Sequence, residues 1–228
     1  MHEPGPLLAS GRDADIFEYG PGLVLRRSRR QHSIAAEAKV MDFVRARGYP
    51  VPAVHEVSDD GLDIVMERIE GESMVDALGA KPWTVHAAAD MLADLHLRLH
   101  QIEAPPWLDA APCAPGDRVI HLDLHPLNVM MAKSGPVVID WSNAARGHPA
   151  TDVVLTWLLT ECGEVDTGPV MRVLIRTLRQ ILTRRFLGHF ERATLTPHLA
   201  AVVAWKATDP NMSAAECDAM RALASTHR

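Results

Sequence analysis

The sequence is poor in cysteine, and the few cysteines do not pair by spacing. There are three of them, Cys113, Cys162 and Cys217, an odd number spread along the chain. This pattern is typical of reduced thiols in a cytoplasmic protein and not of a disulfide framework. Because there is no CxxC pair, the usual signature of a structural zinc site is missing as well.

Long hydrophobic runs are also absent. The longest mostly apolar stretch, Val153 to Leu159, is far shorter than the roughly 20 residues that span a membrane. The first residues, MHEPGPLL, include an acidic side chain and two prolines, whereas a signal peptide begins with a basic and then an apolar segment. We therefore expect a cytoplasmic protein with no membrane partner.

Positive charge is not in excess either. The chain has 23 lysines and arginines against 29 acidic residues, a formal charge of -6. This balance predicts no nucleic-acid partner and suits a cationic small molecule. With 228 residues, of which 47% are hydrophobic and 23% charged, the chain has the composition of a globular protein of one domain or two lobes.

Residues 1–68 have the pattern of an antiparallel sheet with one helix. Short apolar runs are separated by turns at residues 20–22 and 58–61, which predicts the order strand, strand, strand, helix, strand, strand. Ser33 is expected to be the N-cap of the helix. The apolar stripe of this helix contains a carboxylate, Glu37, and a buried carboxylate needs a cationic partner.

Residues 69–228 are mostly helical in pattern. Apolar residues at helical spacing predict a helix from Val85 to about Ile102, and the chain is helical again from about Thr151. Two short apolar strands are expected between these segments, at 119–122 and 136–140. The chain therefore predicts an α+β fold with a small antiparallel-sheet lobe (1–68) and a mostly helical lobe (69–228).

The stretch VIHLDLHPLNVMM, followed by VVIDW, gathers the residue types that phosphoryl transfer needs. It places Asp123 and Asn128 in one loop and Asp140 at the end of the next strand. Such a site needs a carboxylate near the attacking hydroxyl group, and an amide oxygen with a second carboxylate to hold magnesium on the phosphates. The spacing supplies all three groups.

With these residues the sequence resembles the aminoglycoside phosphotransferase family, the small-molecule branch of the protein-kinase-like fold, whose catalytic loop reads His-x-Asp-x-x-x-x-Asn. The resemblance implies a bilobal kinase-like fold that uses ATP and Mg²⁺ to phosphorylate a hydroxyl group of a small molecule. It implies Asp123 as the catalytic base and Asn128 and Asp140 as magnesium ligands. It also implies that His121 is structural, and His125 is expected to order the loop.

The N-terminal strands agree with this resemblance. Protein kinases place a lysine on the third strand and pair it with a glutamate on the following helix, where the lysine holds the nucleotide phosphates. Val24 and Arg26 match the alternation of that Ala-x-Lys signature, so Arg26 stands at the lysine position with Glu37 as its partner. Arg27 takes the position if the register slips by one residue. A guanidinium binds phosphate with a different geometry from lysine.

Two further parts of the nucleotide site are inferred from position alone. The loop at residues 11–15 contains one glycine instead of three, which is equally typical of an ordinary hairpin turn. The strand that ends at Arg68 lies where the hinge of the family meets adenine, so Met66 and Arg68 are expected to bind the nucleotide. Residues 1–68 would then form the nucleotide-binding lobe, and residues 69–228 would carry the catalytic loop and the acceptor site.

The segment GHPATD, which ends at Asp152, resembles the part of the family that follows the metal-binding aspartate. Asp152 is expected to cap the next helix and to brace the catalytic loop. Only about a dozen residues separate Asp140 from Asp152, which leaves no room for a long phosphorylatable activation segment. We therefore expect a constitutively assembled site.

Several alternatives stay open. The arginine at position 26 and the single glycine of the first loop are compatible with a catalytically silent nucleotide-binding protein. His121, Asp123 and His125 could converge on a metal ion, as in metal-dependent hydrolases. The arginine-rich helix from Val170 to Phe190 could bind a membrane or nucleic acid, although its apolar stripe is typical of any helix that faces a core.

The identity of the acceptor is also open. The acceptors of the family include aminoglycosides, macrolides, choline and sugars, and both antibiotic resistance and metabolism remain possible roles. Acidic side chains in the helical lobe could attract a polyamine such as an aminoglycoside. These are Glu161, Glu164, Asp166, Asp209 and Glu216.

Overall fold

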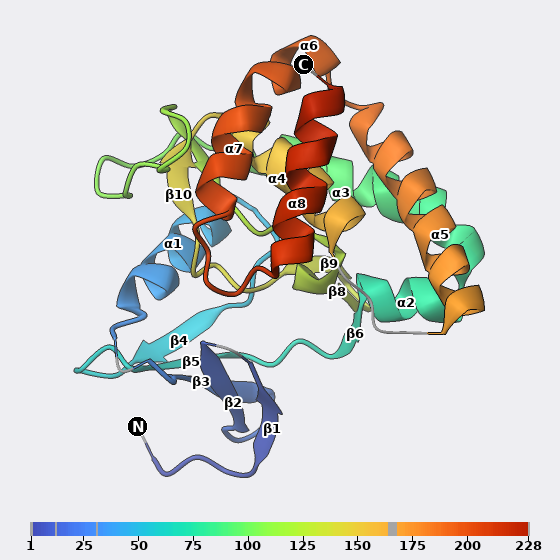
Figure 1. Cartoon of the computed structure of the whole chain (residues 1–228). Helices are drawn as coiled ribbons and strands as arrows, with labels where there is room; N and C mark the ends of the chain where they lie inside the picture. Colours follow the sequence, from blue (N-terminus) through green and yellow to red (C-terminus); the bar gives the residue numbers. More distant parts are fainter. Residues whose placement is uncertain (1, 12, 31, 164–167, 228) are drawn as a thin grey trace. The chain divides into compact units, whose positions relative to one another are not determined.

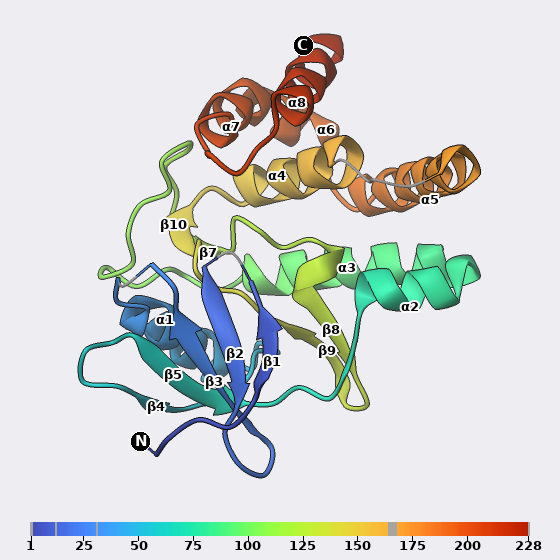
Figure 2. The same ribbon diagram turned by 60° about the horizontal axis from the view of Figure 1, so that its bottom comes forward.

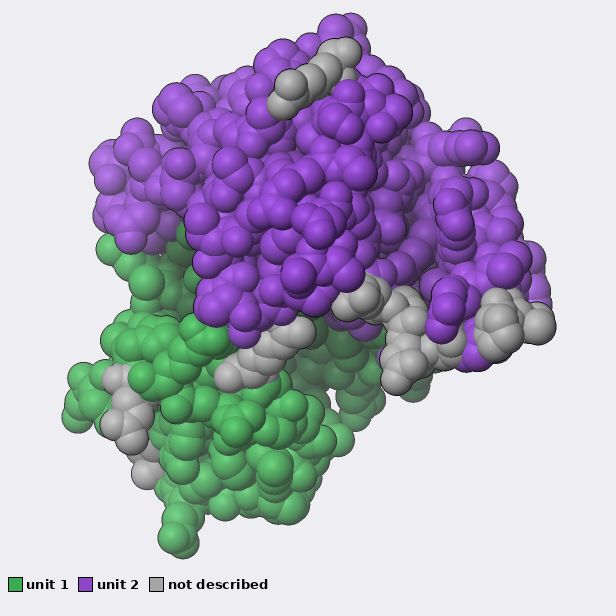
Figure 3. All heavy atoms as spheres, viewed as in Figure 1, with its two compact units in different colours: residues 1–73, 128–144 green, residues 74–127, 145–228 purple. Residues whose placement is uncertain are grey.

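The computed structural model describes residues 2–11, 13–30, 32–163 and 168–227. The chain divides into two compact units (Figure 3). The first unit comprises residues 1–73 and 128–144, and the second comprises residues 74–127 and 145–228. Each unit is therefore built from two separate stretches of the chain, and residues 128–144 group with the N-terminal sheet.

The first unit contains a five-stranded antiparallel sheet (Figures 1 and 2). Its strands follow the order β1-β2-β3-β5-β4 across the sheet. Their bounds are β1 Leu7–Ser10, β2 Ala14–Glu18, β3 Leu23–Ser28, β4 Val54–Val57 and β5 Asp63–Glu67. Gly20 and Gly22, at φ of 89° and 71°, allow the tight turn between β2 and β3. The predicted order of strands and helix is confirmed.

One helix, α1 (Ala35–Arg45), packs on this sheet. Its buried side chains include Ala38, which forms an apolar cluster with Ile34 and Ile64. The N-cap is Ile34, one residue after the expected Ser33, although the Ser33 hydroxyl accepts the N–H of Ala35, the first residue of the helix, at 3.3 Å. The N–H group of Ile34 donates to the Gly61 carbonyl at 2.8 Å, so backbone bonding and burial of Ile34 fix where the helix begins.

A three-stranded antiparallel sheet, ordered β6-β8-β9, completes the first unit. Its strands are β6 Gly71–Ser73, β8 Val129–Ala132 and β9 Gly135–Val138. The backbone of Met131 passes so close to Gly71 that no side chain fits there. The pairing of β6 with β8 joins residues 71–73 to residues 130–132, which explains why the later segment belongs to the N-terminal unit.

The second unit is mostly helical, with one two-stranded sheet. Its helices are α2 Met74–Ala80, α3 Val85–Leu99, α4 Pro149–Cys162, α5 Pro169–Leu187, α6 Arg192–Leu195, α7 Leu199–Lys206 and α8 Ala214–Thr226. The strands β7 (Arg118–Ile120) and β10 (Ala145–Gly147) pair antiparallel. Short 3₁₀ turns are η1 Pro82–Thr84, η2 Pro126–Asn128 and η3 Thr196–His198.

Helix α4 lies in the centre of this unit. Every residue from Ala150 to Leu158 is buried, and α4 contacts α5, α6, α7 and α8. A helix that is surrounded on all sides is apolar on all sides, which accounts for the apolar stretch in the sequence. Within the ranges that the structure describes, no helix is long and apolar enough to cross a membrane.

Helix α5 departs from its predicted packing in its first half. Met171 and Leu174, which the apolar stripe predicts to be buried, are 50% and 45% exposed. Farther along the helix, Leu182 and Phe186 are buried as the stripe predicts. The same periodicity is therefore buried at one end of the helix and exposed at the other.

Candidate active site

Arg26 joins two acidic side chains in the first unit. Its Nε lies 3.1 Å from Oε1 and 3.2 Å from Oε2 of Glu37. Its Nη2 donates to Oδ1 of Asp140 at 3.2 Å. The side chains of Arg26 and Glu37 are 11% and 4% exposed, whereas that of Asp140 is 40% exposed. One cation therefore holds two carboxylates that are far apart in sequence, and we call these three residues the Arg26 cluster.

The alternation of β3 decides which arginine reaches Glu37. Successive side chains of a strand point to opposite faces. Arg26 therefore points toward α1, and Arg27 points to the other face, where it pairs with Asp63 at 2.8 and 2.7 Å. The shifted register, with Arg27 as the partner of Glu37, does not occur.

Burial disfavours the ionised form of Glu37. Burial raises the pKa of this carboxyl group, while the nearby Arg26 guanidinium and the backbone N–H of Trp141 lower it; the net pKa is raised. Because the charged form is poorly solvated, Glu37 depends on Arg26 to remain ionised. The carboxylate expected to need a cationic partner therefore has one.

Asn128 and Asp140 stand at the same end of the β8–β9 hairpin. Val129 pairs with Val138, and the N–H of Ile139 donates to the Asn128 carbonyl at 3.0 Å. Asp140 follows with a left-handed backbone, φ 61°, which is unfavourable for a residue with a side chain. Its Oδ1 accepts from Arg26 and from Ser142 Oγ, so these two contacts help to hold the strained residue.

Met66 and Arg68 lie at the end of β5 and just beyond it. Met66 is half-buried and packs against the apolar cluster of Ile34 beneath α1. The N–H of Arg68 donates to the Gly22 carbonyl at 2.9 Å, and its guanidinium lies 3.7 Å from Glu18. Arg68 also lines a cavity of about 580 Å³ within the first unit. Both side chains thus make contacts separate from those of the Arg26 cluster.

The second unit contains Asp123 on the loop that follows β7. Its Oδ1 lies 3.4 Å from Nε2 of His125. Burial raises the pKa of Asp123, but the hydrogen bond and charge of His125, together with His121 and Lys206, outweigh burial and lower it. Asp123 is therefore ionised at neutral pH and can accept a hydrogen bond from a hydroxyl group.

Asp152 anchors this loop from α4. Its carboxylate accepts the backbone N–H of His121 at 3.1 Å and that of Leu122 at 2.8 Å. Leu122 has a left-handed backbone, φ 58°, and these two bonds hold that unfavourable turn. The N-cap of α4 is His148 and not Asp152, because the His148 ring accepts from the Ala150 N–H. The expected capping role of Asp152 is therefore wrong.

A buried histidine at the C-cap of α3 supports the charge of Asp152. His100 Nε2 lies 3.1 Å from Asp152 Oδ2. Burial raises the pKa of Asp152, but the hydrogen bond from His100 and the charges of His96, His100 and His121 outweigh it and hold the pKa well below its usual range. The carboxylate is therefore ionised although it is completely buried.

A second pair, His96 and Thr156, was not identified from the sequence, where the scattered histidines look like surface residues. Both are buried. His96 Nδ1 donates to the Leu92 carbonyl at 2.8 Å, because a carbonyl only accepts, and Nε2 lies 2.9 Å from Thr156 Oγ1. Burial lowers the pKa of His96 to about 4. The neutral ring offers Thr156 a lone pair, so the hydroxyl proton is shared between His96 Nε2 and the Leu124 carbonyl, which lies at 2.7 Å.

These contacts link α3, α4 and the loop of Asp123. The signal in the sequence is a matched spacing. Two histidines four residues apart, in the last turn and at the C-cap of α3, face an aspartate and a threonine four residues apart on α4. Residues four apart lie on the same face of a helix. We call His96, His100, Asp152 and Thr156 the brace.

The described ranges contain no group of three or more His, Cys, Asp or Glu side chains arranged to hold a metal ion. His121, Asp123 and His125 therefore do not form the metal site of a hydrolase. Two of the acidic residues expected to attract a polyamine, Glu164 and Asp166, lie outside the described residues.

The chain matches one family model, that of the phosphotransferase enzyme family, over residues 6–118 and 106–187. A search of curated proteins finds no match.

Solved structures share the fold at low sequence identity. Aminoglycoside phosphotransferase APH(4)-Ia superposes with a TM-score of 0.71 at 13% identity, over 98% of this chain and 93% of that chain. A choline/ethanolamine kinase family protein from Mesorhizobium loti gives 0.60 at 15% identity, over 97% and 87%. Amicoumacin kinase hAmiN, solved with AMP-PNP, Ca²⁺ and Ami, gives 0.56 at 12% identity, over 97% and 86%. The predicted α+β, protein-kinase-like fold is confirmed.

Proposed function

The chain belongs to the phosphotransferase enzyme family, and we propose that it transfers the γ-phosphoryl group of ATP to a hydroxyl group of a small molecule. The observation that carries this proposal is the Arg26 cluster. In it, residues from three distant parts of the sequence, each expected at a nucleotide or metal site, meet through one guanidinium. A chance arrangement of surface charges would not bury two of the three side chains.

Arg26 would bind the nucleotide phosphates and Glu37 would hold it in place. A guanidinium can donate two parallel hydrogen bonds to phosphate oxygens. The side chain is already ordered by Glu37 before any ligand arrives. Met66 and Arg68 would contact the nucleotide at the end of β5, so that residues 1–68 supply most of the nucleotide-binding lobe. Relatives solved with AMP-PNP support ATP as the donor.

Asn128 and Asp140 would hold magnesium. Their donors are an amide oxygen and a carboxylate, which suit this hard cation. The residues fit the ion, because the Asp140 side chain is 40% exposed and only its Oδ1 accepts from the neighbouring side chains. When bound, magnesium would neutralise charge on the transferred phosphoryl group.

Asp123 would orient the acceptor hydroxyl group and take its proton. It is ionised, and His125 fixes one of its oxygens. Asp152 and the rest of the brace hold the backbone of its loop, while His121 acts as a structural residue beneath it. Catalysis by such a site is mainly positioning and electrostatic stabilisation.

The acceptor would bind to the helical lobe, residues 69–228. A hydroxylated molecule of either kind, an aminoglycoside-like cation or a metabolite, is compatible with the mildly acidic chain. Free thiols at Cys113, Cys162 and Cys217 support action in the cytoplasm.

Thermal stabilisation by ATP, with and without magnesium, tests the nucleotide site. A ligand that binds the folded state raises the melting temperature. We expect a magnesium-dependent rise in the wild type that Asp140→Ala abolishes. Asp63→Ala is the matched control, since Asp63 also pairs with an arginine but on the other face of the sheet. No rise with ATP or GTP in the folded wild type would contradict the proposal.

A catalytically silent nucleotide-binding protein is the second candidate. The contact of Arg26 with Asp140 favours it, because this contact occupies an oxygen of the proposed metal ligand. ATP consumption with a panel of hydroxylated acceptors separates the two functions. In an active kinase, Asp123→Ala abolishes transfer and retains ATP binding. ATP binding without turnover in the wild type would favour the silent protein.

A further inference from the structure

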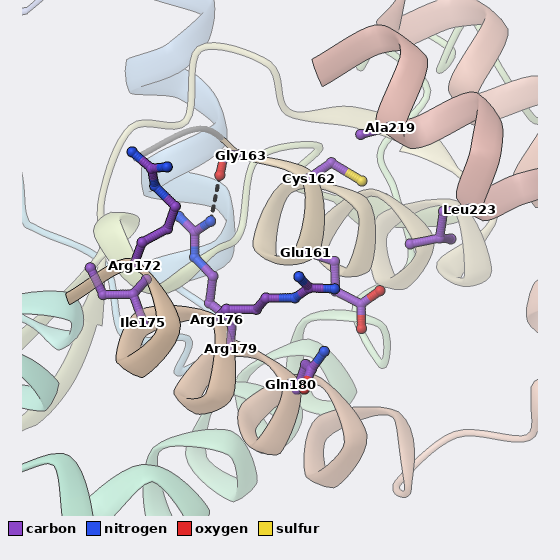
Figure 4. Close-up of a pocket in the computed structure, with 10 residues that line it drawn as sticks. All are labelled: Glu161, Cys162, Gly163, Arg172, Ile175, Arg176, Arg179, Gln180, Ala219 and Leu223. Carbon is purple, nitrogen blue, oxygen red and sulfur yellow. Dashed lines mark hydrogen bonds between the residues drawn. The ribbon is translucent and has the colours of Figure 1, made fainter. Parts of the chain in front are cut away.

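The second unit has a cavity whose lining includes none of the residues proposed to hold the nucleotide, the magnesium ion or the acceptor hydroxyl group. It has a volume of about 860 Å³, within the range of small-molecule sites. Its walls come from the end of α4, the first half of α5 and one face of α8 (Figure 4). This is the half of α5 in which Met171 and Leu174 are exposed.

Three arginines line the cavity from a single face of α5. Arg172, Arg176 and Arg179 are spaced by four and three residues, so they lie along one stripe of the helix (Figure 4). Arg179 donates to the Gly163 carbonyl and pairs with no carboxylate of a described residue. Arg176 makes neither a hydrogen bond nor an ion pair with any residue in the described ranges. Arg172 has other interactions.

The burial of Arg179 makes this arrangement costly. The guanidinium is half-buried, and burial lowers its pKa. The charge of Glu216 on α8 supports this guanidinium without forming an ion pair with it, and an anion bound directly to it would neutralise it further. Among the described residues that line the cavity, Glu161 is the one acidic side chain against three arginines.

Part of the remaining wall, beside Gln180, is apolar. Ile175 of α5 faces the cavity together with Ala219 and Leu223, which are four residues apart on α8. The site thus combines guanidinium groups, which bind carboxylates and phosphates through paired hydrogen bonds, with an apolar surface.

We propose that this cavity binds an organic anion, a carboxylate or phosphate group on a compact apolar body, with Arg176 and Arg179 on the anionic group. The site is distinct from the catalytic loop. Glu161 follows Asp152 by nine residues on α4, which places the cavity roughly 14 Å along the helix from the brace at 1.5 Å per residue. The proposal does not depend on phosphotransferase activity.

Calorimetric titration of the full chain with phenyl phosphate and with benzoate tests this site. Saturating AMP-PNP and magnesium keep the phosphate probe out of the nucleotide site, and benzyl alcohol is the uncharged control. We expect at least one anion to bind and benzyl alcohol not to bind. Preference for phenyl phosphate or for benzoate identifies the anionic group.

Arg176→Gln is the decisive variant, because this exposed side chain can be changed without loss of a contact. It should weaken binding of the anion at least tenfold. Arg184→Gln, on an exposed position of the same helix outside the cavity, should leave binding unchanged. Absence of binding by both anions, or equal effects of the two variants, would overturn the proposal.

Cys162 provides a local readout. It lines the cavity, whereas the half-buried Cys113 does not. The anion should slow alkylation of Cys162 several-fold at pH 9.5 and leave the rate at Cys113 unchanged, as measured by mass spectrometry. Equal rates with and without bound anion at Cys162 would place the ligand elsewhere and reject the site.

Discussion

The two units of the molecule organise their polar residues differently. In the first unit, Arg26 pairs side chain to side chain with Glu37 and Asp140, and the Asp140 end is partly exposed. In the second unit, the brace is buried, and several of its bonds run from side chains to backbone groups of the loop of Asp123. The first arrangement can exchange its partners for a ligand, whereas the second can only hold the chain in place.

This difference suits the Arg26 cluster to ligand binding and the brace to support of the backbone. Charges that meet a ligand must remain accessible, and their mutual contacts are replaced when it binds. Groups that fix a strained backbone, such as Leu122 at φ 58°, must not exchange with water. Substitutions in the Arg26 cluster should therefore act mainly on ATP affinity, and substitutions in the brace mainly on stability and on kcat.

Asp152→Ala should have the largest effect. It leaves the N–H groups of His121 and Leu122 without their acceptor and removes the partner of His100. We expect a loss of about 3–5 kcal/mol in the free energy of unfolding, measured with urea, as for other broken buried pairs. Asp117→Ala, at a side chain 76% exposed, is the control and should change stability little. Equal losses in the two variants would show that the brace does not support the loop.

Arg26→Met should act mainly on the nucleotide. We expect ATP affinity to fall by roughly tenfold to a hundredfold, because a charge-assisted contact worth about 1.5–3 kcal/mol is lost. Stability should also fall, since Glu37 becomes a buried carboxylate without its cation. Adding Glu37→Leu should restore stability but not ATP affinity. Recovery of both properties would mean that Arg26 has no role beyond its ion pair.

The Arg26–Glu37 pair shows how much the sequence can predict. Strand alternation and one carboxylate on an apolar helix stripe are local patterns, and they were sufficient to predict the order of strands and helix along the chain and the need of Glu37 for a cationic partner. The choice of Arg26 as that partner came from the resemblance to the family. The pairing of β6 with β8 could not be predicted, because a three-residue strand is too short to show alternation. The roles of Asp123, Asn128 and Asp140 stay predictions until transfer is measured.

The predicted N-cap of α1 was wrong, and the brace was not predicted, for related reasons. Ser33 has the usual capping chemistry, but the bond from Ile34 to Gly61 and the burial of Ile34 determine the start of the helix. His96 looks like a surface residue because its burial depends on α4, which is more than 50 residues farther along the chain. Tertiary contacts thus determine both the start of α1 and the burial of His96.

Thr156→Val should have a smaller effect that is specific to the loop. It removes the hydroxyl bond to the Leu124 carbonyl and preserves the shape of the side chain. We expect kcat to fall about tenfold through misplacement of Asp123, with KM for ATP unchanged and about 1 kcal/mol of stability lost. Thr156→Ser should restore kcat. A fall in kcat that serine does not restore would indicate altered packing.

Asp90→Asn should have the smallest effect, because its contacts are exposed. Asp90 accepts from Arg185 at 2.6 and 3.0 Å and contacts His189 at 2.7 Å. Arg185 first, and His189 second, lower its pKa to about 2. Its stabilising contribution is therefore present above pH 4 and is lost as the pH falls toward 2. We expect Asn to lower the melting temperature by about 2 °C at pH 7, with the difference narrowing below pH 4. If the difference in melting temperature did not change with pH, the charge of Asp90 would not be its cause.

The division of the first unit into residues 1–73 and 128–144 has a consequence for synthesis on the ribosome. At about 5–20 residues per second, several seconds pass between the emergence of β6 and that of β8 and β9. During that interval β6 has no partner strand, and Arg26 can pair with Glu37 but not with Asp140. The first unit therefore cannot be completed until residues 128–144 are synthesised. A nascent chain stalled near residue 127 presents an open strand edge to chaperones and to other chains.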